Sequence, residues 1–417
     1  MQRYSIFQLM RQALRGHQGW QPAWREAQPK AAYDVVIVGG GGHGLAAAYY
    51  LAKNHGICNV VVVEKGLMGL GNVGRNTTII RSNYFTAPNI RFYDHSLKLW
   101  ENLEQELNFN IMVSQRGTLN LAHSDGQRDL FTRRANAMLL EGVDISFLDK
   151  AAIKTLVPLI DTEGGRFPVV GGFLQKRGGT VRHDAVTWGY ARAASARGVD
   201  IIQNCAVTGI RREGATATGV MTERGFIGAK TIVLAVAGHS SLLAAMAGFR
   251  LPLETHVLQA FVTESIKPLL DIVVTYGAGH FYVSQSDKGG LVFGGATDGY
   301  NSYAQRGSLP MVEDVHGAGV TLMPALSRLR VLRQWGGVMD MSMDGNPILS
   351  TTPVENILIS TGWCYGGFKA IPAGGMAMAH LVATGQPHPL AAHFGLERFS
   401  SGRIIDERGV GPFPYLH

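Results

Sequence analysis

The first strong pattern in the chain is an apolar run at residues 35–38, which predicts a buried strand. A glycine-rich turn follows, then a helical pattern over residues 45–54, then a second apolar run at residues 59–63. Continuous apolar runs of this length are typical of strands that helices cover on both faces. The segment therefore predicts a β–α–β unit in a parallel sheet.

Later segments show either the two-residue period of strands or the 3.6-residue period of helices. Alternating apolar and polar residues at 117–121 and 281–284 predict antiparallel strands. Short apolar runs at 231–235 and 357–360 predict a return to the buried sheet. Helical patterns cover residues 88–108, 125–142, 184–197 and 312–330. Together these patterns predict an α/β fold with a buried parallel sheet and additional antiparallel strands.

Composition narrows the function classes without changing the predicted fold. The chain has 417 residues, of which 46% are hydrophobic and 17% charged, so it can bury a sizeable core. Lys and Arg number 38 against 31 Asp and Glu, but the basic residues form no run of the kind that binds nucleic acid. We therefore expect no nucleic-acid partner, and we interpret the net charge of +7 as favouring anionic ligands or an acidic partner.

Cysteine usage and hydropathy bear on the compartment. Cys58, Cys205 and Cys364 are odd in number and show no CxxC spacing, which disfavours both a disulfide framework and a zinc cluster, so no metal site is expected. No run of about 18 apolar residues free of charge occurs, and residues 1–20 lack the apolar core of a secretory signal. These features predict a cytoplasmic protein without a membrane span.

Residues 1–32 predict an N-terminal arm ahead of the first strand. This segment carries five Lys or Arg and one acidic residue, and it alternates short helical patches with prolines. Two interpretations remain open, a disordered leader or a segment that docks on another subunit through Phe7, Leu9, Trp20 and Trp24.

Gly39, Gly41 and Gly44 form a G-x-G-x-x-G motif between the predicted strand and helix. The first glycine permits a tight turn, the second lets a pyrophosphate approach the backbone, and the third lets helix and strand pack closely. The N-terminus of the helix offers free N–H groups to the phosphates. Glu64 closes the second strand 20 residues after Gly44, where a carboxylate accepts hydrogen bonds from ribose hydroxyls. Strand, turn, helix, strand and acid together predict a dinucleotide site.

The segment after Glu64 favours FAD over NAD as the dinucleotide. An NAD-dependent dehydrogenase would continue with another β–α–β unit. Residues 65–84 instead form a long polar stretch rich in Gly, Asn and Thr, which suits wrapping around a flavin ribityl chain.

At these residues the chain resembles the glycine oxidase, D-amino acid oxidase and sarcosine oxidase superfamily, and most closely the β subunits of heterotetrameric sarcosine oxidases. The resemblance extends over residues 33–408 and rests on stretches in the same order, among them YDVVIVGGGGHGLAAAYYLAKNHG, RNTTIIRSNY, RGGTVRHDAVTWGYARAA, RQWGGVMD and GGFKAIPAGG. It implies an FAD-binding Rossmann-like domain of the glutathione reductase type, with an interleaved α+β substrate domain built on an antiparallel sheet. The implied FAD-binding parts are 33–115, 181–248 and 341–417, and the implied substrate parts are 116–180 and 249–340.

The resemblance also implies which residues contact FAD. Those expected at the phosphates and the adenosine ribose are Gly42, His43 and Glu64, those at the middle of the cofactor are Asn72, Thr77 and Thr78, and Val207 would contact the adenine through its backbone. Gly366 and Gly367 precede a helix, so their N–H groups would face the flavin pyrimidine oxygen, where negative charge grows on reduction.

His183 is expected to carry a second flavin. In RGGTVRHDAV it matches the histidine that, in the β subunits the chain resembles, forms a covalent bond to FMN near the interface with the α subunit. Arg182, together with Lys176 and Arg177, would supply positive charge for the FMN phosphate. Without the resemblance, a histidine beside an aspartate is more often an ordinary surface residue. The resemblance further implies partner subunits of the α, γ and δ type.

Arg81 and Lys369 are the candidate catalytic residues, because the resemblance implies that they hold a substrate carboxylate. Arg offers a planar fork of hydrogen bonds, and Lys adds a second positive charge. The alternative for each is a surface cation. The implied substrate is an N-methyl amino acid whose methyl group points at the flavin, which accepts a hydride from it. His280 and Tyr282 are expected in a strand that could cover the flavin.

Departures from monomeric relatives bear on the flavin chemistry. Those relatives carry a lysine that promotes oxygen attack and a cysteine that binds FAD covalently. Residues 290–293 offer no lysine and residues 339–344 offer no cysteine. The resemblance then implies a non-covalent FAD that reacts poorly with oxygen and passes electrons to FMN, and it disfavours a stand-alone oxidase.

Other departures leave the substrate open. Sarcosine-oxidising β subunits usually have Leu-Trp-Asp-Glu-Ser after RSNY, whereas residues 85–88 here are Phe-Thr-Ala-Pro; they also have Gly and Thr where this chain has Cys364 and Tyr365. We therefore expect a catalytic subunit that oxidatively demethylates either sarcosine or, like the N-methylglutamate dehydrogenases, N-methyl-L-glutamate. A rival from another class is a non-catalytic flavin-holding subunit whose partner performs the oxidation.

Overall fold

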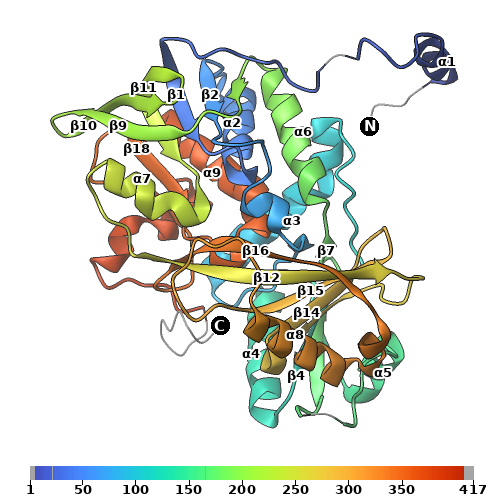
Figure 1. Cartoon of the computed structure of the whole chain (residues 1–417). Helices are drawn as coiled ribbons and strands as arrows, with labels where there is room; N and C mark the ends of the chain where they lie inside the picture. The colour runs from blue at the N-terminus through green and yellow to red at the C-terminus, as the bar shows by residue number, and fades with distance from the viewer. Residues whose placement is uncertain (1–4, 21, 165, 408–417) are drawn as a thin grey trace.

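Two eight-stranded sheets organise the described part of the chain, which passes between them several times. The computed structural model describes residues 5–20, 22–164 and 166–407. In Figure 1 the long strands β12 (Leu253–Ser265) and β16 (Val331–Ser342) run across the middle of the molecule, below the first sheet and its helices. The α/β class predicted from the sequence patterns and the second sheet implied by the resemblance are both confirmed.

The first sheet grows from the predicted β–α–β unit. β1 (Ala32–Val38) and β2 (Val60–Val63) are parallel, with Val35 opposite Val60 and Val38 opposite Val63. Alternate residues of each strand enter two different apolar cores, one on each face of the sheet, which is why the sequence reads as a continuous apolar run. The sheet order is β17-β18-β11-β1-β2-β8. The strands parallel to β1 are β8 (Asp200–Ile202), β11 (Gly225–Leu234) and β18 (Ile357–Thr361), whereas β17 (Ile348–Thr351) is antiparallel to them. A hairpin of β9 (Val207–Glu213) and β10 (Thr216–Thr222) is attached to β11.

Helices rich in small residues pack on this sheet. α2 (Gly42–His55) and α9 (Ile371–Thr384) approach so closely that a Cβ at Gly375 would lie 2.4 Å from the Cβ of Ala46. The contact brings the glycine turn before α2 next to the turn before α9, although more than 300 residues separate them. The other helices of this part are α3 (Ala87–Leu107), α6 (His183–Ser195) and α7 (Ser240–Met246), and a small two-stranded sheet joins β3 (Ile79–Ile80) to β7 (Gly179–Thr180).

The second sheet is mixed rather than wholly antiparallel. Its order is β16-β12-β15-β14-β13-β4-β6-β5, with β4 (Thr118–Ala122), β5 (Ser146–Leu148), β6 (Gly171–Gln175), β13 (Val273–Tyr276), β14 (Phe281–Gln285) and β15 (Gly290–Thr297), and it is accompanied by α4 (Asp125–Leu140), α5 (Lys150–Leu156) and α8 (Leu309–Leu322). β4 is antiparallel to β6 but parallel to β13. The antiparallel prediction for residues 117–121 is therefore correct for the pairing with β6 and wrong for the pairing with β13. About 150 residues separate β4 from β13 in the chain, so no hairpin fixes the relative direction of these two strands.

One predicted helix is shorter than its pattern. The sequence predicts a helix over residues 312–330, but α8 ends at Leu322 and a separate 3-10 turn spans Pro324–Arg328. The break falls at Met323, whose backbone lies outside the helical region, with φ −133° and ψ 86°. A residue before proline avoids the helical region, so Pro324 ends the helix.

The N-terminal arm has two parts. α1 (Ile6–Leu14) projects away from the body in Figure 1, and Phe7, Leu9 and Trp20 are exposed. Trp24 is instead half-buried and packs against the core of the first sheet, so it belongs to the root of the arm rather than to a docking surface. None of the described helices is both long enough and apolar enough to cross a membrane.

Candidate cofactor and substrate site

A cavity of about 750 Å³ lies between the first sheet and strands β12 and β16. Its walls come from the carboxyl ends of β1 and β2, from the loop over residues 70–77, and from the turns that lead into α9. This position outside the carboxyl ends of parallel strands is where α/β folds bind ligands. The wall contains eleven of the predicted site residues, namely Gly39, Gly41, Gly42, His43, Glu64, Asn72, Thr77, Arg81, Val207, Gly367 and Lys369.

The glycine turn forms a cradle at one part of this wall. Gly39 has φ +112°, and a Cβ there would lie 2.3 Å from the carbonyl oxygen of Ala235. A Cβ at Gly44 would lie 2.1 Å from the carbonyl oxygen of Gly39, so this glycine packs α2 against β1 and does not line the cavity. A Cβ at Gly41 would meet no atom within 4 Å, because it points into the open cavity. The cradle at the start of α2 therefore fits a pyrophosphate.

Glu64 and Val207 lie at the same end of the cavity. The two carboxylate oxygens of Glu64 accept hydrogen bonds from the backbone N–H groups of Gly40 and Gly66, each at 2.9 Å. Each oxygen keeps a lone pair for a further donor. Val207 and the preceding Ala206 form the adjoining wall. This end fits an adenosine whose ribose hydroxyls meet Glu64.

His43 connects the glycine turn to the turn before α9. Its Nε2 lies 2.9 Å from the carbonyl oxygen of Gly367, and its ring stacks on Trp363 with centroids 4.1 Å apart. Burial lowers the pKa of His43 to about 4, so the ring is neutral and its Nε2–H donates to Gly367. The N–H group of the ring is thus already used in a hydrogen bond within the protein, so a contact with a phosphate would come from the backbone N–H of His43.

The loop that follows β2 is fastened to β16. The amide nitrogen of Asn72 donates to the carbonyl oxygen of Val338, and the indole nitrogen of Trp335 donates to the carbonyl oxygen of Arg75 at 2.8 Å. Thr78 lies outside the cavity wall; it has φ +70° and accepts a hydrogen bond through its carbonyl oxygen from the backbone N–H of Val181 at 3.0 Å. It therefore joins the cavity loop to the segment before His183.

Arg81 and Lys369 lie together on the wall at the other end. Lys369 is only 7% exposed, and its Nζ donates to the carbonyl oxygen of Tyr365 at 2.6 Å. Burial, followed by the charge of Arg81, holds the pKa of Lys369 well below its usual value. The Arg81 guanidinium donates to the side-chain oxygen of Asn83 at 2.6 Å and lies above the ring of Tyr84, 5.1 Å from its centroid. Neither cation forms an ion pair with an acidic side chain of the described chain, which suits an anionic ligand.

Asp340 lies on the cavity wall and was missed by the sequence reasoning. Asp340 is buried, and its carboxylate accepts hydrogen bonds from the backbone N–H of Trp363 at 3.2 Å and from the Thr361 hydroxyl at 3.1 Å. Burial raises the pKa of Asp340 to about 6. Cys364 also lies on the wall and has φ +47°, in the region that favours glycine. The signal available for Asp340 was its place as the last residue of RQWGGVMD, a stretch that carries the resemblance, and Cys364 had already been noted as a departure.

Two expectations for this end need correction. The backbone N–H of Gly366 donates to the carbonyl oxygen of Trp363 at 2.8 Å, so it does not face the cavity; a 3-10 turn (Cys364–Gly366) consumes it. Gly367 does lie on the wall. His280 lies just before β14 in an exposed turn, whereas Tyr282 lies on the wall, and burial raises its pKa to about 12. Of this pair, Tyr282 lies on the cavity wall and His280 does not.

His183 begins α6, outside the cavity. Its Nδ1 is buried without a hydrogen-bond partner among the described residues, and burial lowers its pKa. Arg182 is paired with Asp184 at 2.8 Å, and Arg177 with Glu101 at 2.8 Å. Lys176 is exposed. Two of the three cations expected at an FMN phosphate are therefore already neutralised within the chain.

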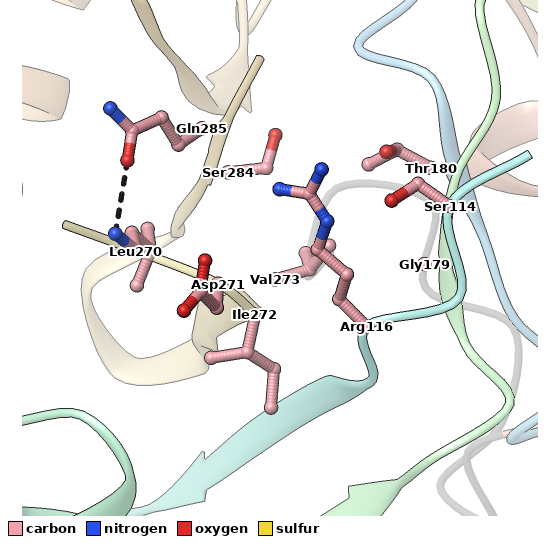
Figure 2. Close-up of a pocket in the computed structure, with 10 residues that line it drawn as sticks. All are labelled: Ser114, Arg116, Gly179, Thr180, Leu270, Asp271, Ile272, Val273, Ser284 and Gln285. Carbon is pink, nitrogen blue, oxygen red and sulfur yellow. Dashed lines mark hydrogen bonds between the residues drawn. The ribbon is translucent and has the colours of Figure 1, made fainter. Parts of the chain in front are cut away.

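Figure 2 shows a second, much smaller hollow of about 10 Å³, between β13, β14 and the segment before β7. Arg116 points into it, but its guanidinium pairs with Asp287 at 2.9 Å. The side-chain oxygen of Gln285 accepts from the backbone N–H of Leu270 at 3.0 Å, as the dashed line marks. A hollow of this volume holds about one water, so it offers no ligand site.

Comparison with known proteins places the chain in a family. Residues 34–381 match the family described as FAD dependent oxidoreductase. The chain is 64% identical over 415 residues to the sarcosine oxidase subunit beta of Rhizobium meliloti (strain 1021), covering 100% of both chains. It is 50% identical over 388 residues to the sarcosine oxidase subunit beta of an Arthrobacter species, covering 93% of this chain and 96% of the relative.

Solved structures agree with this placement. The L-proline dehydrogenase of P. horikoshii superposes with a TM-score of 0.84 at 27% identity, covering 91% of this chain and all of that one. The glycine oxidase of Geobacillus kaustophilus shares the fold, with a TM-score of 0.79 at 22% identity over 88% of this chain and 99% of that one. The chain belongs to the FAD dependent oxidoreductase family and, within it, to the sarcosine oxidase subunit beta family.

Proposed function

We propose that this chain is the subunit that binds and oxidatively demethylates an N-methyl amino acid, with sarcosine as the first candidate. The observation that carries the proposal is the pair Arg81 and Lys369, two cations without an acidic partner in the described chain, on the wall of a cavity that fits FAD. The names of the two relatives quoted above support sarcosine.

The chain's own residues would bind and orient the substrate. Arg81 presents a fork of N–H groups to the substrate carboxylate, and the buried Lys369 lies beside it. Because Lys369 is held at a lowered pKa, an approaching carboxylate favours its charged form and strengthens the contact. FAD, when bound, supplies the chemistry by accepting a hydride from the N-methyl carbon. The protein contributes the position of that carbon relative to the cofactor.

N-methyl-L-glutamate is the alternative substrate. Cys364 and Tyr365, which differ from the residues usual in sarcosine-oxidising β subunits, both lie on the cavity wall. Two cations would also suit a substrate with two carboxylates. Steady-state kinetics on both amino acids separates the two proposals, since the true substrate has the higher kcat/KM.

The test of the catalytic role is Lys369→Met, with Lys288→Met as control, because Lys288 is exposed and lies off the cavity wall. Under anaerobic conditions, sarcosine should bleach the flavin absorbance of the wild-type enzyme and of the control. Loss of both positive charge and hydrogen bond should slow bleaching by about 100-fold or more in Lys369→Met. Equal bleaching in all three would favour a non-catalytic, flavin-holding chain.

We further propose that FMN is attached to His183, at a surface that a partner subunit covers. The buried Nδ1 of His183 lacks a hydrogen-bond partner in the described chain. Two exposed apolar side chains lie nearby: Trp188 is in α6, and Met112 follows Ile111, whose carbonyl oxygen accepts from the backbone N–H of Arg182. Lys176 is the cation free to approach the phosphate, because Arg177 and Arg182 are held by carboxylates. The mass of the acid-precipitated chain should exceed the sequence mass by one FMN, and His183→Ala should remove that increment. An unchanged sequence mass in the wild type would contradict this assignment.

The arm is proposed as a docking segment for a partner chain, of the α, γ or δ type that the resemblance implies. α1 exposes Phe7 and Leu9 together with Arg11, a combination that suits an apolar groove with acidic rims. The body holds the root of the arm through Arg25 and Lys30, which both pair with Asp200, at 2.6 and 3.0 Å.

The three free cysteines favour a reducing, cytoplasmic location.

A further inference from the structure

The last described residues of the chain reach the beginning of α3, more than 300 positions earlier in the sequence. The side chain of Glu407 accepts hydrogen bonds there from the backbone N–H groups of Phe85 and Thr86, the latter at 3.2 Å. It also accepts from the Thr86 hydroxyl at 2.7 Å and from the Asn89 amide at 2.8 Å. One carboxylate thus accepts four hydrogen bonds, three from the two residues just before the helix and one from Asn89 in its first turn.

The residue before α3 makes no side-chain cap, and Glu407 binds the start of this helix instead. Thr86 is the residue before α3, a position where a threonine normally accepts from an N–H two or three residues later. Its side chain makes no such bond, and its hydroxyl donates to Glu407. The negative charge also lies at the positive end of the helix dipole. The start of α3 is therefore fixed by a residue from the other end of the chain.

The segment that delivers Glu407 is itself anchored in the core. Arg398 and Asp344 form a buried, two-pronged ion pair at 2.7 and 2.9 Å. The backbone N–H of Ile405 donates to the same Asp344 carboxylate at 3.1 Å. The side-chain oxygen of Asn346 accepts from the Asn89 amide at 2.7 Å, which ties this anchor to α3 as well. We name residues 398–407 the C-terminal strap.

The strap is connected to the substrate site through Phe85 and its neighbour Tyr84. Phe85 follows Tyr84 directly, and Tyr84 stacks on Tyr93 with ring centroids 3.6 Å apart. The guanidinium of Arg81 lies over the ring of Tyr84. Because Glu407 holds Phe85 and Thr86, it also fixes the position of the neighbouring Tyr84 ring, over which the Arg81 guanidinium lies.

We propose that Glu407 is a positioning residue that holds Arg81 in place for the substrate carboxylate, by clamping the segment at residues 84–86. The inference rests on the proposed role of Arg81. It also gives the departure at residues 85–88 a function, because this chain's Thr86 supplies the hydroxyl that Glu407 binds. Substrate affinity would then depend on a residue that does not touch the substrate.

The test uses acetate as probe, a carboxylate that cannot be oxidised, titrated into the purified flavin-containing enzyme with its partner chains. Binding is followed by the change in flavin absorbance. Glu407→Ala should weaken acetate binding and raise KM by about tenfold or more, since small displacements of a binding group have effects of this order. Glu407→Gln should give a smaller effect, because its amide still accepts on one side. FAD content should stay unchanged, and kcat should fall less than KM rises.

Glu397→Gln is the matched control, because Glu397 is exposed and belongs to the same C-terminal region. A second arm uses Arg81→Ala: if Glu407 acts through Arg81, adding Glu407→Ala to that variant should weaken acetate binding no further. Wild-type affinity in Glu407→Ala, or additive losses in the double variant, would overturn the inference alone. Failure of the wild-type enzyme to bind acetate would overturn the proposed carboxylate site as well. If Glu407→Ala does not fold, Glu407→Gln and Thr86→Val carry the same comparison.

Discussion

The ring of His43 lies flat against the indole of Trp363, with centroids 4.1 Å apart and planes 17° apart, and its Nε2 is 2.9 Å from the carbonyl oxygen of Gly367. One side chain from the dinucleotide motif thus holds the turn that carries Lys369. This neutral imidazole therefore adds a direct contact between the glycine turn and the turn before α9, beside the packing of α2 on α9.

His43→Ala should damage both ends of the cavity together. Removing a buried aromatic ring and its hydrogen bond should lower the free energy of unfolding by about 2–4 kcal/mol. Because the turn at Gly367 loses its support, acetate or sarcosine binding should weaken along with FAD retention. Urea unfolding and FAD content measure the two effects, with exposed His280→Ala as control. Loss of FAD with unchanged acetate affinity in the reconstituted enzyme would contradict the connection.

Gly41 and Gly44 should fail in different ways when substituted. A side chain at Gly41 enters the open cavity and meets no protein atom within 4 Å, so Gly41→Val should fold normally yet lose FAD. A Cβ at Gly44 would collide with the carbonyl oxygen of Gly39 at 2.1 Å, so Gly44→Ala should destabilise the fold itself. Circular dichroism, thermal unfolding and bound flavin distinguish the two outcomes. Retention of FAD by Gly41→Val would exclude the pyrophosphate from this cradle.

Sequence reasoning located the parts of the site that depend on local order. The glycine turn and Glu64 are separated by one helix and one strand, so their spacing alone places them on one wall. The sequence did not predict that the N–H of Gly366 is used in a hydrogen bond to Trp363. That bond depends on a single 3-10 turn, which leaves no periodic signal in the sequence.

Contacts between distant segments lay beyond the sequence. Asp340 reaches the cavity because β16 is paired with β12, and the identity of a strand's neighbour is not written in its own pattern. The parallel pairing of β4 with β13 escaped prediction for the same reason. Glu407 caps a helix that begins more than 300 residues earlier, so no capping motif could reveal it.

Asp340 should make stability and activity depend on pH near 6. Its pKa is raised from 3.8 to about 6 in the folded protein, so the group favours folding below pH 3.8, and this contribution is lost as the pH rises through 6. A difference of about two pKa units corresponds to roughly 3 kcal/mol across this window. Asp340→Asn should remove this part of the pH dependence, which urea unfolding at about pH 4 and about pH 7 measures.

The same variant should change the pH profile of kcat/KM. Asp340 lies on the cavity wall, so its ionisation places a negative charge beside the site, and an inflection near pH 6 is expected in the wild type but not in Asp340→Asn. Asp271→Asn serves as control, because Asp271 is exposed and lies at the small hollow instead. Identical profiles in all three proteins would remove Asp340 from the site's electrostatics.

The buried ion pair of Arg398 and Asp344 should be far more sensitive to single than to double substitution. Both side chains are almost wholly inaccessible, and the carboxylate also accepts from the backbone N–H of Ile405. Arg398→Met leaves an uncompensated buried carboxylate and should cost about 3–5 kcal/mol of stability. Adding Asp344→Asn removes that charge and should recover much of the loss, giving a strongly non-additive cycle by urea unfolding. The exposed pair Lys230 and Asp34 should tolerate the loss of either partner with little change in the unfolding midpoint. Additive losses at Arg398 and Asp344 would show that packing, rather than charge compensation, fastens the strap.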